Sequence, residues 1–256
     1  MPMLNIKGSH MYYTVKGEGI PIVLIHPPLL TSANFMYQVE QLSKKYKVIT
    51  FDMRGHGRSV YSKQPLTYSL IVEDMICLLD ALQIEKAFIG GYSTGGTITL
   101  AFLLAHADRA LGGIVISGMS EVKDVWLRQR ISVAVTLANR KTLPFLSRII
   151  ARGNANNRQM FRKLHREAIC GHARNIRQYY EYSVKYRCTS ELQNIQVPIL
   201  LVYGTKDKSF HPYARMLHEK LPSNELVFLA VHHQIPTKAA ATLNNEIDAF
   251  ICNNSV

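Results

Sequence analysis

Short runs of consecutive apolar and β-branched residues recur along the chain, and most of them end at Gly, Pro, Asp or His. Such runs are typical of strands that are buried on both faces of a parallel sheet. They lie at residues 21–25, 46–51, 86–90, 112–117, 197–203 and 225–230. Two earlier runs, at residues 3–7 and 11–15, flank Gly8-Ser9-His10 and predict an antiparallel opening hairpin.

Between these runs, apolar residues recur at the spacing of three to four residues that amphipathic helices show. Helices are predicted at residues 34–45, 68–82, 97–106, 212–221 and 237–251. Strands that alternate with helices of this length indicate βαβ units and a mostly parallel sheet. The predicted fold class is therefore α/β, with an eight-stranded sheet and helices on both of its faces.

The alternation stops at residue 121 and resumes near residue 197. The intervening segment shows only helical patterning, with junctions at Pro144, Gly153-Asn154 and Gly171. The helical pieces span residues 122–139, 142–152, 155–169 and 172–187. We therefore expect an all-helical cap over residues 121–190, inserted into a core formed by residues 1–120 and 191–256.

The aromatic residues of this cap are expected mostly in the core between its helices, with a few lining a pocket. They are Trp126, Phe145, Phe161, Tyr179, Tyr180 and Tyr182. The apolar residues Leu127, Ile131 and Leu164 belong to the same group.

Composition supports a folded protein, because 47% of the residues are hydrophobic and only 19% are charged. The four cysteines are scattered without metal-binding or redox spacing, which favours free thiols in a reducing compartment. They are Cys77, Cys170, Cys188 and Cys252. The sequence lacks a signal-like apolar start and any run of about 18 apolar residues, so we expect a cytoplasmic protein without stable membrane insertion.

The net charge of +12 is concentrated in residues 121–190, which hold 15 Lys and Arg against 4 Asp and Glu. Such a segment could attract nucleic acid, anionic lipid or an acidic substrate, or it could be a solvated helical face that aids solubility. It carries no motif of a nucleic-acid reader, so we expect no nucleic-acid partner.

One pentapeptide, Gly91-Tyr92-Ser93-Thr94-Gly95, stands between the predicted strand 86–90 and the predicted helix 97–106. A serine on a sharp turn from strand to helix takes a strained backbone conformation, and glycines on either side let the strand and the helix approach closely. The pattern predicts that Ser93 is an exposed nucleophile.

A serine hydroxyl needs a base to take its proton, and the base needs a carboxylate to orient it. In an open α/β sheet, functional residues gather at the carboxyl ends of the strands. Asp207 follows the strand at 197–203, and His232 and His233 follow the strand at 225–230. Since no cluster has metal-ligand spacing, we expect a site without a metal or cofactor.

These motifs together resemble the α/β-hydrolase fold family over essentially the whole chain. The turn around Ser93 resembles the nucleophile elbow of the family, and Asp52 to Ser59 is similar to its D-x-R-G-x-G-x-S loop. Gly204 to Asp207 matches the loop that carries the acid, and a helical cap is typical of the family. The resemblance implies that Ser93 is the nucleophile and Asp207 the orienting carboxylate.

The resemblance also chooses between the two histidines. In the family, the base is followed by an Asn about eleven residues later and a Phe about seventeen residues later. Counted from His233, these positions are Asn244 and Phe250, whereas a count from His232 meets neither. We therefore assign the base to His233.

The oxyanion hole departs from the family pattern. One donor should be the backbone N–H of Thr94, and the other should follow a His-Gly pair at the end of the third strand. Here that pair is His26-Pro27, and the aligned donor position is Pro28, which has no N–H. Either Leu29 supplies the donor through a shifted loop, or the hole has one backbone donor and the Thr94 hydroxyl offsets part of the loss.

Three residues are expected to line the site, namely His26, Pro28 and Tyr92. His26 should also brace its loop, and His56 should have a structural place in a Gly-rich turn. Arg54 is expected to form an ion pair with Asp52 that braces the loops.

The sequence thus predicts a serine hydrolase that cleaves a small or medium carboxylic ester or lactone through an acyl-enzyme. Carbon–carbon bond hydrolysis and perhydrolysis use the same triad and stay open. The alternative from another class is a signalling protein that binds a small molecule with slow or no turnover, which Pro28 and the basic cap both fit. Nucleic-acid binding would rest on the charge of the cap alone. A monomer or a homodimer is expected.

Overall fold

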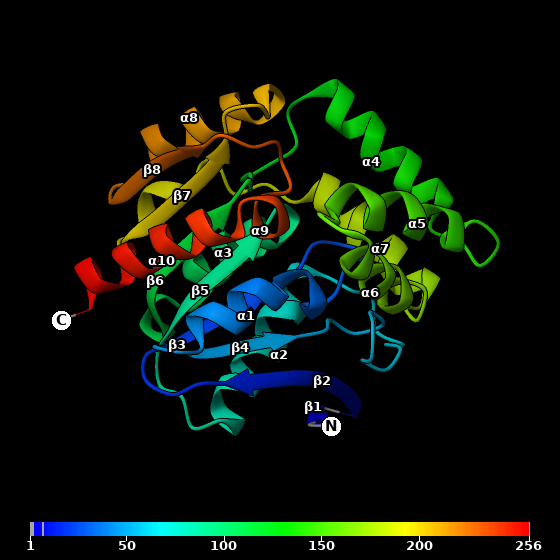
Figure 1. Ribbon diagram of the computed structural model, residues 1–256, viewed down its shortest axis with the longest axis horizontal. Coiled ribbons are helices and arrows are strands. Elements are labelled where there is room, and N and C mark those ends of the chain that lie inside the picture. Colours follow the sequence, from blue (N-terminus) through cyan, green and yellow to red (C-terminus); the bar gives the residue numbers. More distant parts are fainter. Residues whose placement is uncertain (1–2, 7, 256) are drawn as a thin grey trace.

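The computed structural model describes residues 3–6 and 8–255, and it contains one eight-stranded sheet in the order β1-β2-β4-β3-β5-β6-β7-β8 (Figure 1). The strands are β1 (Met3–Ile6), β2 (Ser9–Lys16), β3 (Pro21–Ile25), β4 (Lys47–Phe51), β5 (Ala87–Tyr92), β6 (Ala110–Ile116), β7 (Ile199–Gly204) and β8 (Asn224–Leu229). The β1–β2 and β2–β4 pairs are antiparallel and the five other pairs are parallel, so the predicted fold class is confirmed. Lys7, which the predicted first strand includes, lies outside the described residues.

Each central strand sends alternate side chains into two separate cores. In β3, Val23 and Ile25 belong to one apolar cluster, and Ile22 and Leu24 belong to the other. This follows from the two-residue period of a strand, which points successive side chains to opposite faces. Because both faces are covered, the strand needs an apolar residue at every position, as its continuous apolar run indicated.

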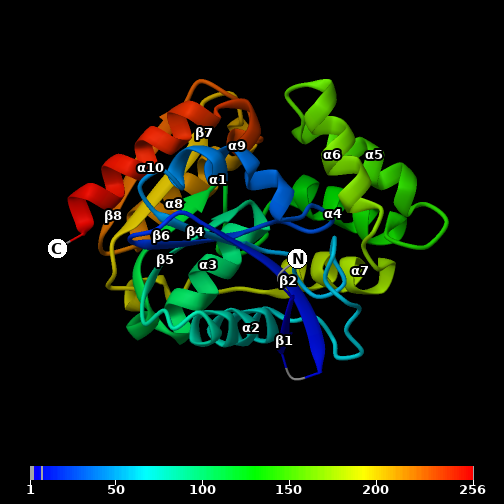
Figure 2. The ribbon, with the colours of Figure 1, turned by 60° about the horizontal axis from the view of Figure 1, so that its bottom comes forward.

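Helices cover both faces of the sheet (Figure 2). They are α1 (Met36–Leu42), α2 (Tyr68–Ala81), α3 (Thr94–Ala105), α8 (His211–Lys220), α9 (Ile235–Lys238) and α10 (Ala240–Asn254). The buried residues of α2, α3 and α8 join one cluster, and those of α1 and α10 join the other. Two predicted helices differ in detail. The first begins as a 3₁₀ turn at Ser32–Phe35, and the last is divided at Ala239.

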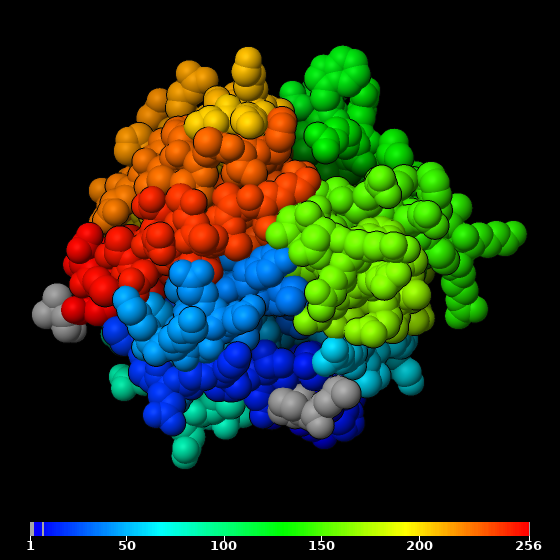
Figure 3. Space-filling model, in the orientation of Figure 1, coloured from blue at the N-terminus to red at the C-terminus, as the bar shows by residue number. Residues whose placement is uncertain are grey.

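Four helices lie between β6 and β7 in the sequence, and they gather beyond the carboxyl ends of the parallel strands (Figure 1). They are α4 (Val125–Leu137), α5 (Leu143–Asn154), α6 (Arg158–Ala168) and α7 (Ala173–Lys185), and we call them the cap. Figure 3 shows the cap, in green to yellow-green, against the blue and orange parts of the core. Each predicted helical piece is present, while the division of the chain into two domains stays a prediction.

The cap aromatics are less uniformly buried than the sequence indicated. Tyr179 and Tyr180 are buried, but Trp126 is 75% exposed and Phe145 is 59% exposed. The interpretation of these last two as core residues is wrong, because α4 buries Ile131 and Ala134 instead of Trp126, and α5 buries Leu143 and Leu146 instead of Phe145. Within the described ranges, the helices lack the combination of length and hydropathy that crossing a bilayer requires.

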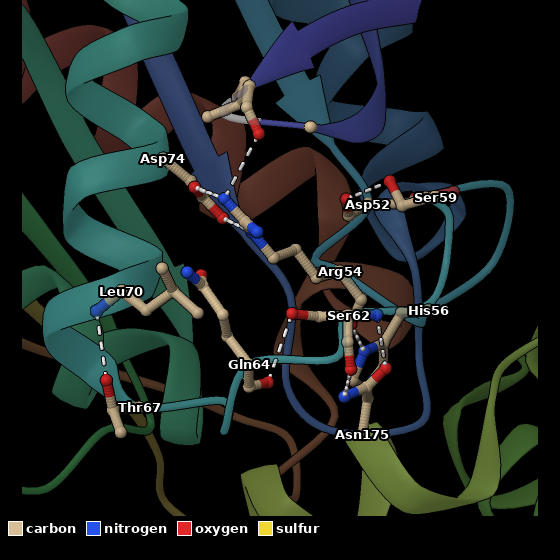
Figure 4. Close-up of polar contacts among 12 residues, drawn as sticks. Asp52, Arg54, His56, Ser59, Ser62, Gln64, Thr67, Leu70, Asp74 and Asn175 are labelled. Carbon is tan, nitrogen blue, oxygen red and sulfur yellow. Dashed lines mark hydrogen bonds and ion pairs between the residues drawn. The ribbon is translucent and has the colours of Figure 1, made fainter.

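The loop after β4 is held by buried polar contacts (Figure 4). The Arg54 guanidinium donates to both carboxylate oxygens of Asp74 on α2, at 2.6 Å each. Asp52 instead accepts the backbone N–H groups of Ser32, at 2.8 Å, and Arg58, at 3.0 Å. The predicted ion pair between Arg54 and Asp52 is therefore wrong. The long Arg54 side chain reaches a helix that the sequence did not place beside it.

We expect Arg54→Leu to lower the free energy of unfolding by about 3–5 kcal/mol, because it removes the guanidinium that donates two hydrogen bonds to the buried Asp74 carboxylate. Both side chains of this pair are at most 5% exposed. The matched control is Arg177→Leu, which removes the exposed pair with Glu181 on α7 and should cost about 0.5 kcal/mol. Urea unfolding of the two variants measures both values, and equal losses would contradict a supporting role for the buried pair.

Candidate active site

Ser93 stands at the turn from β5 to α3 with a φ of 56° and a ψ of −120°. A non-glycine residue rarely takes a positive φ, and such a conformation costs about 1–3 kcal/mol. The two glycines of the pentapeptide are required by space. A Cβ at Gly91 would fall on the carbonyl group of Gly95, and a Cβ at Gly95 would fall on the carbonyl oxygen of Ile25. Larger residues at Gly91 or Gly95 would therefore force the neighbouring backbone segments apart and open the turn that carries Ser93.

The ends of β7 and β8 bring a carboxylate and an imidazole to this serine. The His233 Nε2 lies 3.1 Å from the Ser93 Oγ, and the His233 Nδ1 lies 2.7 Å from an Asp207 carboxylate oxygen. The Ser209 hydroxyl donates to the other Asp207 oxygen at 3.0 Å. His232 borders the neighbouring cavity, but His233 is the histidine that lies between the serine and the aspartate.

The charge state of Asp207 follows from two opposing effects. Burial favours the neutral carboxyl, but the hydrogen bond and charge of His233, with smaller contributions from Ser209 and Arg130, outweigh it and lower the Asp207 pKa. Asp207 is therefore ionised at neutral pH and accepts the proton on Nδ1 of His233. The opposite nitrogen, Nε2, is left as an acceptor for the hydroxyl of Ser93.

Two aromatic rings and a backbone contact fix the His233 side chain. The Phe210 ring lies 4.3 Å from the imidazole, and the Tyr92 ring lies 5.4 Å from it, between ring centroids. The Ser117 hydroxyl donates to the His233 carbonyl oxygen at 3.3 Å. The imidazole thus has one orientation imposed from several sides, as a general base requires.

A cavity of about 520 Å³ opens over Ser93, His233 and Asp207, and both the core and the cap border it. Pro28 and Tyr92 line it, as the sequence predicted. The cap supplies an apolar wall of Leu127, Ile131, Ala134 and Ile150. It also supplies three polar side chains, those of Arg130, Asn154 and Tyr180. The size and the mixed lining are typical of a site for a small organic molecule.

The place of Leu29 in the oxyanion hole stays a prediction. The φ of Leu29 is 70°, its side chain packs into the core with 1% exposure, and it does not border the cavity that Ser93 and Pro28 line. The Leu29 N–H has no protein acceptor among residues 3–6 and 8–255. The Thr94 N–H begins α3, where the first N–H groups of a helix lack intrahelical acceptors. Within residues 3–6 and 8–255 it has no protein acceptor.

His26 does not line the cavity, so that part of the sequence prediction is wrong. The side chain is fully buried, with Nδ1 donating to the Pro27 carbonyl at 2.9 Å and Nε2 accepting the Met53 N–H at 3.0 Å. It therefore joins the loop after β3 to the loop after β4. His56 packs beside it, with the ring centroids 5.3 Å apart. Both histidines support the loops rather than the chemistry.

Sequence reasoning missed Arg130 and Asn154 as cavity residues, and it could not single out Tyr180 from the other cap aromatics. No local signal distinguishes them, because the packing of α4, α5 and α7 decides which cap side chains face Ser93. In the described part of the chain, no three His, Cys, Asp or Glu side chains are grouped as metal ligands would be, and we assign no residue to a metal.

A family model described as the alpha/beta hydrolase fold matches residues 20–235. The chain belongs to this family. The alpha/beta hydrolase relatives include a protein of Caulobacter segnis that is proposed to be the carbamate hydrolase RutD, with 38% identity over 42% of this chain and 43% of that protein. The match thus spans less than half the length of this relative.

Two further similarities extend over more of the chain. The 3-oxoadipate enol-lactonase 1 of Acinetobacter baylyi is 26% identical over 79% of this chain and 78% of that protein. The crystal structure of an enol-lactonase from Burkholderia xenovorans LB400 matches with a TM-score of 0.86 and 22% identity, covering 98% of this chain and 100% of that one. The second likeness shows that the alpha/beta hydrolase fold is shared over the whole chain.

Because His26 and His56 are buried, we expect the free energy of unfolding to decrease as the pH falls. Burial lowers the pKa of His26 from 6.5 to about 4, and burial with the nearby His26 charge lowers that of His56 from 6.5 to about 3. Between these values and 6.5 only the unfolded chain binds the proton, so the free energy of unfolding decreases as the pH falls. Each histidine should contribute about 1.4 kcal/mol per pH unit.

Urea unfolding between pH 4.5 and 6.5 measures this slope. We expect His56→Gln to reduce it by about 1.4 kcal/mol per pH unit, whatever its effect on stability at pH 7. His10→Gln, at an exposed position on β2, is the control and should leave the slope unchanged. A slope that His56→Gln does not alter would show that this side chain is protonated in the folded protein.

Proposed function

We propose that this protein is a serine hydrolase that cleaves a small or medium carboxylic ester or lactone through an acyl-enzyme. The observation that carries the proposal is the chain of contacts from Ser93 to His233 to Asp207, at 3.1 and 2.7 Å, on the floor of a cavity. These distances are those of a nucleophile, a general base and an orienting carboxylate.

The reaction follows from this geometry. The Ser93 Oγ attacks the substrate carbonyl while the His233 Nε2 takes its proton, and Asp207 stabilises the resulting imidazolium. The tetrahedral oxyanion accepts a hydrogen bond from the backbone N–H of Thr94, at the start of α3. The intermediate then collapses to an acyl-serine, and His233 gives its proton to the leaving alcohol. Water, activated by the same nitrogen, releases the acid and restores the serine.

The relatives support attack on a carbonyl joined to a heteroatom, because their names describe a carbamate hydrolase and enol-lactonases. Esters and lactones contain the same reacting bond. The cavity of about 520 Å³ supports a small or medium substrate, and its apolar cap wall favours an acyl or alcohol group with some hydrocarbon character.

A fluorophosphonate probe tests the activated serine directly. The native protein should label rapidly and in a one-to-one ratio, and Ser93→Ala should abolish labelling. Ser132→Ala, which changes an exposed serine of α4, is the control and should label like the native chain. Asp207→Asn should fold but react about 10⁴-fold more slowly, because it loses the charge that fixes the imidazole tautomer. A native protein that does not label would contradict the hydrolase and favour a ligand-binding protein.

Arg130 gives a prediction about the substrate. Among the described residues that border the cavity it is the only Lys or Arg, and it has no carboxylate within ion-pair distance. A substrate that carries a carboxylate away from the scissile bond should therefore gain a charge-assisted hydrogen bond from this side chain.

Kinetics with matched esters, one neutral and one bearing a distal carboxylate, tests this expectation. Arg130→Gln should raise KM about 10-fold for the anionic ester and change the neutral ester less than about 3-fold. Arg128→Gln is the matched control, since its guanidinium donates to the Val122 carbonyl and does not border the cavity. Equal effects of Arg130→Gln on both esters would contradict recognition of a carboxylate.

A further inference from the structure

The usual position of the second oxyanion donor holds a proline, so the second donor must come from another group. The position after His26-Pro27 is Pro28, which borders the cavity beside Ser93 and Thr94 but has no N–H. Removing one donor from an oxyanion hole typically costs about 10²–10³ in rate. An active hydrolase on this scaffold therefore needs a donor from somewhere else.

We propose that the Tyr180 hydroxyl supplies this second donor to the substrate oxyanion, in place of the N–H that Pro28 lacks. The inference rests on the proposed serine hydrolase function. Tyr180 lies on α7, is 9% exposed, and borders the same cavity as Ser93 and Thr94. Its hydroxyl lies 3.5 Å from the Pro28 carbonyl oxygen, so it is beside the residue whose N–H is missing.

The contact with Pro28 leaves the hydroxyl available. A separation of 3.5 Å is long for an O–H···O hydrogen bond, whose usual range ends near 3.0 Å. A developing oxyanion is a charged acceptor and makes a shorter and stronger bond than a neutral carbonyl. The Tyr180 O–H can therefore rotate about the ring–oxygen bond and donate to the substrate oxyanion instead of the Pro28 carbonyl, at little cost in free energy. Burial raises the pKa of the Tyr180 hydroxyl, which keeps the proton in place.

Hydrogen bonds at both the start and the middle of α7 fix the position of Tyr180 relative to the loop that carries Pro28. The neighbouring Tyr179 hydroxyl donates to the His26 carbonyl at 3.1 Å, on the same loop as Pro28. At the start of the helix, the Asn175 side chain accepts the Ser62 N–H at 2.9 Å and donates to the Ser62 carbonyl at 3.1 Å. These contacts hold Tyr180 over the loop before any substrate binds, and such preorganisation is what makes an oxyanion donor effective.

Two other groups could fill the gap, and the experiment must separate them from Tyr180. Leu29 is not among the residues that border the cavity, but its N–H has no protein acceptor in the described ranges, and it is one competing donor. The Thr94 hydroxyl is buried at the start of α3, beside the Tyr179 hydroxyl, and it is the other competing donor that the experiment must distinguish.

The experiment compares Tyr180→Phe with the native chain in ester hydrolysis. We expect kcat to fall about 10²–10³-fold with KM changed less than about 3-fold, because the donor acts on the transition state and not on the bound ester. The Ki of a boronic acid, which forms a tetrahedral adduct with the serine, should rise by a similar factor. Tyr182→Phe is the matched control on the same helix, since Tyr182 packs against Tyr68 and Tyr186 and does not border the cavity.

A second variant separates catalysis from misfolding. Pro28→Ala restores a backbone N–H at the donor position, so the Tyr180→Phe/Pro28→Ala pair should recover at least about 10-fold of the lost kcat. A merely structural Tyr180 would give no such rescue. The proposal is overturned if Tyr180→Phe keeps kcat within about 3-fold, or if Thr94→Val shows the loss instead.

The outcomes also separate this proposal from the proposed function. A native chain that labels with fluorophosphonate and hydrolyses esters, while Tyr180→Phe does the same, would refute the role of Tyr180 alone. A native chain that neither labels nor turns over would refute the serine hydrolase, and the Tyr180 donor with it.

Discussion

The arrangement of the site depends on how closely three backbone segments approach one another behind Ser93. Gly91 pairs with Ile25 of the neighbouring strand, and Gly95, at the start of α3, touches the carbonyl of the same Ile25. No side chain fits between these segments. The close contact holds the turn tight, and the tight turn forces Ser93 into its positive φ and out into the cavity. The packing of β3, β5 and α3 therefore stabilises a strained residue that is costly by itself.

In the proposed mechanism, the same junction fixes where the oxyanion forms. The loop that leaves β3 starts next to Gly95, and buried polar contacts hold it in place. His26 joins it to the loop after β4, and Tyr179 of α7 donates to the His26 carbonyl, while the Tyr180 hydroxyl lies 3.5 Å from the Pro28 carbonyl oxygen. The cap thus takes part in the construction of the site and is not only a cover. A Pro at the usual donor position becomes acceptable when a cap helix places a hydroxyl beside it.

Much of this organisation could be predicted from the sequence because it is local. Strand runs, helix periodicity and the glycines around Ser93 each depend on a few neighbouring residues, and all gave the observed elements. Asp207 and the pair His232 and His233 were brought together because the carboxyl ends of parallel strands meet at one edge of the sheet. With that rule, residues that follow different strands in the sequence can be predicted to lie close together before any side-chain contact is known. The choice of His233 came from the resemblance to the alpha/beta hydrolase family.

Tertiary structure alone decided which distant side chains meet. Arg54 bonds to Asp74 rather than Asp52, because only the packing of α2 brings that carboxylate within reach. Trp126 faces solvent although its residue type favours burial, since α4 buries Ile131 and Ala134 instead. The positions of Arg130 and Tyr180 at the cavity also follow from the angles between cap helices. Helix periodicity specifies which residues share a face, but it does not specify what that face contacts, and this decides the lining of the site.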